Sequence, residues 1–190
     1  MNPERMRDDL VVEQTAIVSQ MPPAAEVEDL YARASAVAPL SESPHVAGLF
    51  AGLYQHARDL PGAVAMTARR EEALVGFAYG HPWSWETATD SWSEKLADRL
   101  GGNAAALEDS MVVELLAVAP SEARNGLGTR LLQGVMSGSD RPTCWLVTTD
   151  LDTPARRLYQ RCGWTSLGHG PDAPNGSPSL VMIHHRGDLP

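Results

Sequence analysis

One nearly continuous apolar run, residues 111–118, constrains the fold of this chain more than any other feature. A short run of this kind, followed closely by Pro120, is typical of a strand buried on both faces of a sheet. After a glycine-containing turn, Leu127, Leu131 and Val135 recur every four positions, as on the buried face of a helix. The run therefore predicts a strand, turn and helix unit at the centre of a layered domain.

Shorter apolar runs and helical periodicities predict the remaining elements. With 190 residues, 43% of them hydrophobic, the chain can form one domain with a substantial core. We expect Ser43-Pro44 and Asp152 to start helices, and residues 69–72 to form an exposed hairpin turn. The expected fold is α/β, a mixed and twisted sheet of six to seven strands flanked by about four helices. Strands are expected at 11–19, 63–67, 74–79, 111–118, 145–148 and 179–184, and helices at 27–37, 46–57, 127–135 and 152–162.

Three segments lie outside this pattern. The polar residues 1–9 are expected to be frayed. Residues 81–109 carry Trp83, Trp85 and Trp92 and resemble an insertion with a short helix at 92–100. Residues 168–177, rich in Gly and Pro, are expected to form a loop, because too little chain follows them to fold alone. The whole chain, 1–190, is therefore predicted to be a single domain.

Charge and residue spacing argue against several classes of partner. The net charge of −9, with 15 Lys and Arg against 24 Asp and Glu and no basic stripe, disfavours nucleic acid and slightly favours a cationic small molecule. The chain has no apolar run of about 18 residues and no secretory stretch, so we expect a cytoplasmic protein without a membrane partner. Cys144 and Cys162 are expected to be buried, inert thiols, and His81, His184 and His185 lack the spacing of metal ligands.

The turn after the central strand reads Ala123-Arg124-Asn125-Gly126-Leu127-Gly128-Thr129. Glycines between a strand and a helix let a ligand approach backbone amides at the positive end of the helix dipole, an arrangement suited to phosphate. The same pattern also occurs as plain helix-start geometry, so the turn alone leaves phosphate binding open. Neither GxGxxG nor GxxxxGK[ST] occurs, which disfavours NAD and nucleoside triphosphates.

Two motifs in the second half of the chain occur in a telling order. The first reads Val118-Ala119-Pro120 followed by Ala123-Arg124-Asn125-Gly126-Leu127-Gly128, and the second runs from Asp152 through Ala155 and Tyr159 to Gly163-Trp164. Together with the strand order over most of residues 60–185, they resemble the GNAT superfamily of N-acetyltransferases. The resemblance implies acetyl-CoA as co-substrate, no metal, and an amine acceptor. The usual Gln or Arg is Ala123, with Arg124 one step later, and the usual Asn is Asp152.

The same resemblance implies roles for individual residues. Glu114 would act as the general base, and Tyr159 would protonate the departing CoA sulfur. Backbone groups on the central strand would pair with the pantetheine amides, and those of the turn would hold the pyrophosphate. The implied CoA-binding residues are Leu116, Ala117, Val118, Ala123, Arg124, Asn125, Gly126, Leu127, Gly128, Thr129, Asp152 and Ala155.

Considered without the family, two of these residues have plainer interpretations. A carboxylate at Glu114, inside an apolar strand, costs several kcal/mol to bury unless it is solvated, paired or working, so an ion-paired or rim-exposed structural glutamate is the alternative to a base. Tyr159 would simply be an aromatic residue on the core face of a helix. Both roles therefore depend on the resemblance.

The acceptor is the least constrained part of the interpretation. Trp83, Trp85 and Trp92 lie where the family often forms an acceptor wall, although they could equally pack the insertion. A walled pocket favours a small-molecule primary amine as substrate. The alternatives are a protein lysine or N-terminus, and a CoA-binding sensor without turnover, which the departures at Ala123 and Asp152 motivate. Dimerisation is common in the family, so a homodimer is left open.

Overall fold

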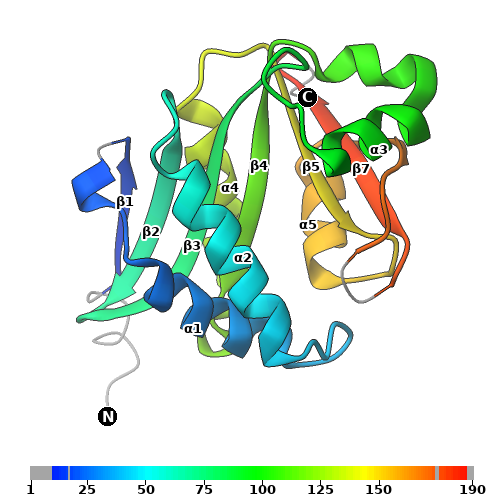
Figure 1. Ribbon diagram of the computed structural model, residues 1–190. Coiled ribbons are helices and arrows are strands. Elements are labelled where there is room, and N and C mark those ends of the chain that lie inside the picture. Colours follow the sequence, from blue (N-terminus) through cyan, green and yellow to red (C-terminus); the bar gives the residue numbers. More distant parts are fainter. Residues whose placement is uncertain (1–9, 17, 174–175, 188–190) are drawn as a thin grey trace.

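The computed structural model describes residues 10–16, 18–173 and 176–187, arranged as a central sheet with helices on both faces (Figure 1). The sheet has seven strands in the order β1-β2-β3-β4-β5-β7-β6, the upper number expected from the sequence. The expected frayed segment 1–9 lies outside the described residues. The strands are β1 (Leu10–Thr15), β2 (Val64–Arg70), β3 (Ala73–Trp83), β4 (Ser110–Val118), β5 (Thr143–Thr149), β6 (Thr165–His169) and β7 (Ser179–His185). The α-helices are α1 (Ala24–Ser35), α2 (Pro44–Ala57), α3 (Ser91–Leu100), α4 (Leu127–Ser137) and α5 (Pro154–Arg161).

The sheet consists of two antiparallel parts joined by one parallel pair. β1 to β4 pair antiparallel in sequence order, and β5, β7 and β6 form the second antiparallel part. β4 and β5 are parallel, with α4 as the crossover between them, which is the strand, turn and helix unit predicted around the central apolar run. Beyond their paired residues the two strands diverge (Figure 1).

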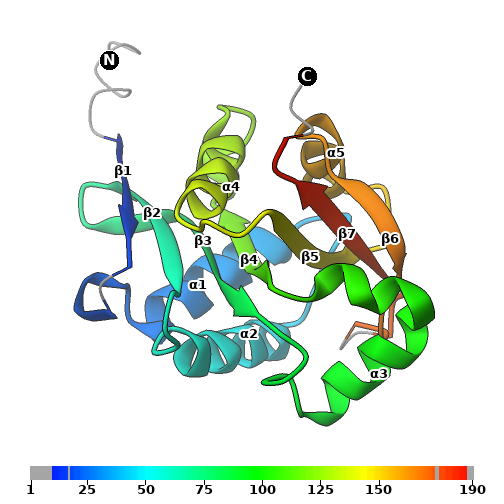
Figure 2. The same cartoon turned by 90° about the horizontal axis from the view of Figure 1, so that it is seen from above.

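Helices cover the two faces of the sheet unequally. α1 and α2 lie on one face, and α4 and α5 lie on the other (Figure 2). On the first face the Tyr54 ring of α2 contacts the rings of Phe77 and Tyr79 at centroid distances of 5.1 and 5.0 Å. On the second face Leu127 and Leu131 of α4 come close to Gly76 of β3. These contacts form one main core around β2, β3 and β4.

A second, smaller core lies under α3 and the following 3-10 helix η2 (Gly101–Leu107). It joins that part of the chain to β5 and β7, so residues 81–109 are anchored on the sheet rather than extended from it. Its buried members are Leu96, Leu100, Leu107, Val112, Trp145, Val181 and Ile183.

The first strand is shorter than predicted. β1 ends at Thr15 instead of continuing to residue 19, and a 3-10 turn, η1, spans Val18–Gln20. The Thr15 hydroxyl donates to the Gln20 side-chain oxygen at 3.1 Å, across this turn. Local hydrogen bonding of this kind competes with extension of the strand ladder.

The loop predicted at 168–177 begins too early, because β6 includes Gly168 and His169. This strand lies at the edge of the sheet, pairs with β7 alone and keeps most of its side chains at least partly exposed. An edge strand needs few apolar residues, so the alternation that identifies buried strands is absent from its sequence.

The predicted N-cap at Asp152 is also wrong by one residue. α5 is capped by Thr153, whose hydroxyl accepts a hydrogen bond from the backbone N–H of Arg156 at 3.0 Å. Pro154 occupies the first helical position. Asp152 instead forms an ion pair with Arg157, with 2.6 Å between Asp152 Oδ1 and Arg157 Nη1.

The hairpin between β2 and β3 has a tighter turn than predicted. Arg69 and Arg70 belong to β2 and form ion pairs with other elements, so they are not part of an exposed turn. The turn itself is Glu71-Glu72, with Glu71 at φ 53°.

Among the described residues, the structure contains no helix that is long and apolar enough to cross a membrane.

Candidate active site between the diverging strands

The centre of the site is the place where β4 and β5 separate. Their parallel ladder consists of the pairs Met111–Cys144, Val112–Trp145 and Val113–Leu146. Beyond Val113, β4 remains paired with β3 as far as Val118, and β5 remains paired with β7 as far as Thr149. Within the described residues, the edge of β4 that carries Leu116, Ala117 and Val118 therefore has no strand beside it on the β5 side.

A β-bulge places Glu114 at the start of this unpaired edge. Tyr79 of β3 faces Leu115, whereas the next residue, Gly80, faces Val113, so Glu114 is the extra residue on β4. A side chain at position 80 would collide with the carbonyl oxygen of Val112. Glycine at this position thus permits the close approach of the two strands that accompanies the bulge. Bulges commonly redirect a side chain beside an active site.

Glu114 lies against His81, the residue that follows Gly80 on β3. His81 Nε2 is 3.4 Å from Glu114 Oε1, and the side chains are 11% and 29% exposed. The other ring nitrogen, Nδ1, donates to the carbonyl oxygen of Pro82 at 2.9 Å, since a carbonyl can only accept. Burial lowers the pKa of His81, but the hydrogen bond and charge of Glu114 and the bond to Pro82 outweigh it, so that the pKa lies above its ordinary value.

The hydrogen on Nδ1 decides what the contact between His81 and Glu114 requires. Because Nδ1 carries a hydrogen, the neutral imidazole would point the lone pair of Nε2 at the Glu114 carboxylate. A hydrogen bond between Nε2 and Oε1 therefore needs one further proton, held by either residue. Without that proton, the Nε2 lone pair of His81 faces the negative charge of Glu114. A proton bound between them removes this repulsion.

The predicted phosphate turn leads directly into α4. Arg124 and Gly126 have positive φ angles of 67° and 76°, and Gly126 caps the helix without a side-chain hydrogen bond to its first turn. Arg124, Asn125 and Gly126 are exposed. The first backbone N–H groups of an α-helix have no intrahelical acceptor, and here the residues that supply them include Gly128. A side chain at 128 would press on Leu158, so α4 also begins close to α5.

Tyr159 lies on α5, with its side chain buried in the main core. Burial raises the pKa of its hydroxyl above the ordinary tyrosine value. Its ring is 6.0 Å from that of Trp164, and its hydroxyl is near enough to contribute to the raised pKa of Tyr31, after burial of Tyr31 and its hydrogen bond with Glu42. Ala155 packs at the edge of the same core, whereas Asp152 is exposed.

The three tryptophans of residues 81–109 fall into two environments. Trp83 and Trp85 pack edge to face at 5.5 Å, on the second core, and Trp83 also contacts Trp145 at 4.8 Å. The Trp85 indole N–H donates to the Ala104 carbonyl at 3.0 Å. Trp92 lies on α3 and is 38% exposed. Their predicted contact with an acceptor stays a prediction.

The cysteines and histidines form no cluster suited to other chemistry. Cys144 is buried, and burial raises the pKa of its thiol to about 11; burial also raises the pKa of the partly buried Cys162. A raised pKa leaves little reactive thiolate. Among the described residues, no group of three or more His, Cys, Asp or Glu side chains is placed to hold a metal ion.

Residues 24–164 match the acetyltransferase (GNAT) family. The chain belongs to this family. It is therefore an acyltransferase of a family that uses acetyl-CoA, as the two sequence motifs predicted. A search of curated proteins finds no match.

Several solved structures share the fold. An acetyltransferase from Streptococcus agalactiae is 11% identical with a TM-score of 0.63, and covers 94% of this chain and 99% of its own. An aminoglycoside 6'-acetyltransferase type Ii is 21% identical, with a TM-score of 0.57 and coverage of 95% and 99%. A chain of the NatC complex bound to Gag peptide and CoA is 13% identical, with a TM-score of 0.58 and coverage of 94% and 99%. At these identities the likeness concerns the fold alone.

Sequence reasoning missed two features of this site. His81 was assigned only as a histidine without metal-ligand spacing, and its partner Glu114 is 33 positions away in sequence, on the neighbouring strand. Gly80 gave no signal either, because a glycine at a bulge looks like any other glycine in a strand. The pairing register that brings these residues together depends on the fold.

Proposed function

We propose that this acetyltransferase moves the acetyl group of acetyl-CoA directly onto the primary amine of a small molecule. The observation that carries the proposal is the position of Glu114. It is the bulged residue of the central strand, it begins the unpaired edge of β4, and it is paired with a histidine. A structural glutamate would need a partner but not a bulge at this opening.

The residues around the opening fit the donor. When bound, acetyl-CoA supplies an activated thioester. Backbone groups of Leu116, Ala117 and Val118 on the β5 side of β4 would pair with the amides of its pantetheine stem, and the turn at 123–126 with the start of α4 would hold its pyrophosphate. The segment from 123 to 137 contains Arg124 and Arg130 and no acidic residue, which suits an anionic ligand in a chain of net charge −9.

Glu114 and His81 would together accept the proton of the attacking amine. An amine reacts only as the free base, so its ammonium form must first lose a proton. The pair offers a carboxylate oxygen facing a ring nitrogen, with Nδ1 fixed by Pro82. This first proton passes to Glu114 or, through it, to Nε2 before the attack. As the N–C bond forms and the C–S bond breaks, nitrogen loses a second proton, which balances the proton that the leaving sulfur takes up.

Tyr159 would supply the proton that the leaving sulfur needs. Its raised pKa keeps the phenol protonated at neutral pH, which is the form able to donate. It shares a buried core with β4, whose unpaired edge would hold the donor stem. Asp152, which is exposed and paired with Arg157, and the neighbouring Ala155 stay the weakest of the proposed CoA contacts.

The acceptor class is supported by the chain's charge and by residues 81–109. A cationic small molecule is attracted to an acidic protein, and Trp92 on α3 offers an exposed aromatic face to a cation. The structural neighbours include both an aminoglycoside 6'-acetyltransferase and a complex bound to a peptide, so a protein lysine or N-terminus is the second candidate. A sensor that binds CoA without turnover is the third.

Two measurements separate these candidates. Isothermal titration with acetyl-CoA should give a dissociation constant in the micromolar range, and absence of binding would contradict the donor site. Release of free CoA is then followed with a panel of small amines and, in parallel, with lysine-containing peptides and peptides with free N-termini. Turnover of amines alone supports the proposal, turnover of peptides alone supports the second candidate, and binding without any turnover supports the third.

A further inference from the structure

We propose that the ion pair between Arg70 and Glu122 positions the phosphate turn at 123–126 and thereby sets the affinity for a donor that carries a pyrophosphate. The inference rests on the proposed donor site. It concerns Arg70, which the sequence placed in an exposed hairpin turn, and Glu122, for which no role was predicted from the sequence. Neither is proposed to touch the reacting atoms, so both are positioning residues.

The pair is two-pronged and largely hidden from water. Arg70 Nε donates to Glu122 Oε1 at 2.8 Å, and Arg70 Nη2 donates to Glu122 Oε2 at 3.0 Å. The Glu122 side chain is 9% exposed and that of Arg70 is 28% exposed. The hydrogen bond from Arg70 lowers the pKa of Glu122, against the opposing effect of burial, so the carboxylate stays charged. Paired forks of this kind fix direction as well as distance.

Glu122 lies immediately before the phosphate turn. It ends the 3-10 turn η3 (Pro120–Glu122), whose backbone is held by the bond from Glu122 N–H to the Ala119 carbonyl at 2.9 Å. The Ala119 N–H in turn donates to Val75 of β3 at 2.8 Å. Only residues 123–125 separate Glu122 from Gly126, the cap of α4. The turn therefore lies between Glu122, whose carboxylate is bound by Arg70, and the first turn of α4.

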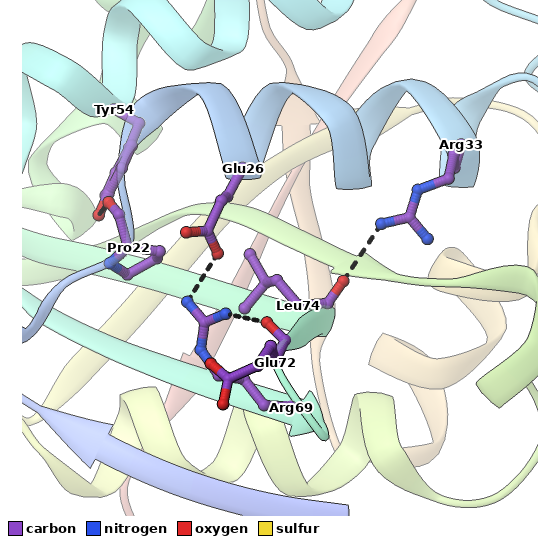
Figure 3. A network of polar contacts seen from close by, with 7 residues as sticks. All are labelled: Pro22, Glu26, Arg33, Tyr54, Arg69, Glu72 and Leu74. Carbon is purple, nitrogen blue, oxygen red and sulfur yellow. Dashed lines mark hydrogen bonds and ion pairs between the residues drawn. The ribbon is translucent and has the colours of Figure 1, made fainter.

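The strand that provides Arg70 is fixed independently on its other face. Its neighbour Arg69 donates to Glu26 of α1 at 2.7 Å and to the Glu72 carbonyl at 2.8 Å, and Arg33 of α1 donates to the Leu74 carbonyl at 3.2 Å (Figure 3). Successive residues of a strand point to opposite faces, so Arg69 braces the hairpin against α1 while Arg70 reaches the turn. The hairpin is thus bound to α1 through Arg69 and to the residue before the turn through Arg70.

Stability alone gives a weak reason for such a pair. A largely buried ion pair is often no more stabilising than apolar residues of similar size, because both charges lose their hydration. Its orientation, by contrast, is specific, since the fork accepts a carboxylate in one plane. The pair ends immediately before residues 123–126, which are exposed, and is placed to hold their backbone in one arrangement.

The experiment compares two arginines and two acetyl donors. Arg70→Met, Arg70→Lys and the matched control Arg69→Met are assayed with acetyl-CoA and with S-acetyl-N-acetylcysteamine, a thioester that lacks the pyrophosphate. We expect Arg70→Met to raise the KM for acetyl-CoA by about tenfold or more with kcat nearly unchanged, and to leave kcat/KM for the short thioester as in the parent. Arg70→Lys should recover part of the affinity, because it keeps the charge and loses the fork.

The control separates positioning from general destabilisation. Arg69→Met breaks an ion pair of the same strand and should lower the melting temperature without changing the KM for acetyl-CoA. The inference fails if Arg69→Met and Arg70→Met raise that KM equally, or if Arg70→Met impairs both donors alike. Should Arg70→Met not fold, Glu122→Gln, which preserves shape, is tested by the same criteria. If the parent protein itself does not bind acetyl-CoA, the proposed function is at fault rather than this inference.

Discussion

His81 Nε2 lies 3.4 Å from Glu114 Oε1, while His81 Nδ1 is bound to the Pro82 carbonyl. At this distance the hydrogen bond and charge of Glu114 act directly on the His81 ring and favour its protonated form. The pKa of His81 is raised, so the ring keeps its proton until the pH rises through a value above the ordinary value of histidine. The proton-accepting form is therefore lost as the pH falls through that value.

His81→Gln should move the acid limb of the pH profile of kcat/KM to lower pH. The variant lacks the ring whose raised pKa sets this limb, so it should keep its proton acceptor at lower pH. The profile is measured with a saturating donor and a limiting amine. His185→Gln, which changes a histidine of β7 bound to Thr143, is the control and should leave the limb in place. An acid limb at the same pH in His81→Gln would exclude His81 as the group that sets it.

Glu114→Gln should lower kcat by about 100-fold to 10,000-fold, because the amide cannot accept the amine proton. Binding of acetyl-CoA, followed by titration calorimetry, should remain near that of the parent. The change preserves shape, so a similar melting temperature is expected. Glu94→Gln, on the exposed face of α3, serves as the control. Unchanged turnover in Glu114→Gln would leave Glu114 as a structural residue.

Tyr159→Phe should lower kcat by about tenfold or more without raising the KM for acetyl-CoA, since only the proton donor is removed. Burial raises the pKa of Tyr159, so the parent should show no loss of activity from its ionisation below about pH 10. Tyr31→Phe removes the neighbouring hydroxyl that binds Glu42 and should keep most of the turnover. Equal effects of the two changes would argue for packing alone.

Gly80→Ala should destabilise the protein by about 1–3 kcal/mol, the usual cost of forcing extra atoms into a packed site. The new methyl group would collide with the Val112 carbonyl, so β3 and β4 must separate at the bulge. We also expect kcat to fall, because Glu114 moves with the bulge. Denaturant unfolding and turnover are measured together. Gly52→Ala, a helical site with open space around it, should leave turnover unchanged and raise stability by up to about 1 kcal/mol, because alanine favours a helix more than glycine does.

Trp92→Ala and Trp85→Ala should affect different properties, the first mainly substrate affinity and the second mainly stability. Trp92 is 38% exposed, so its removal should raise the KM for a cationic amine and cost less unfolding free energy than the removal of Trp85. Trp85 packs on the second core and binds Ala104, so its removal should cost about 3 kcal/mol of stability. An unaltered KM in Trp92→Ala would remove Trp92 from the proposed acceptor wall.

The parts of the fold that the sequence predicted are those with strong periodic patterns. The run at 111–118 and the repeat of Leu127, Leu131 and Val135 became β4 and α4, because buried elements must be apolar at regular intervals. β6 was missed because an edge strand carries no such pattern. The cap of α5 was placed at Asp152 instead of Thr153 because both residue types are favoured at helix starts and the two are adjacent.

The site was predictable only where it follows motifs. The turn 123–129 is a local feature and lies where its glycines indicated. The partner of Glu114, by contrast, comes from β3, and the partner of Glu122 comes from the end of β2. Such contacts depend on strand order and register, which the pattern of one chain leaves undetermined. The charged segment 69–72 shows the same limit. Its charges predicted an exposed turn, whereas Arg69 and Arg70 form ion pairs with residues far away in the sequence.

The separation of β4 from β5 after Val113 has a consequence for how this protein can vary. A recognition surface made of main-chain groups is the same whichever side chains project from it. Sequence drift along Leu116, Ala117 and Val118 would then leave the amide pattern offered to a ligand intact, provided that the residues still form a strand. An unusual side chain in the donor region, such as Ala123, would then reduce ligand affinity only slightly. Residues on the acceptor side could change during evolution while the donor side kept its function.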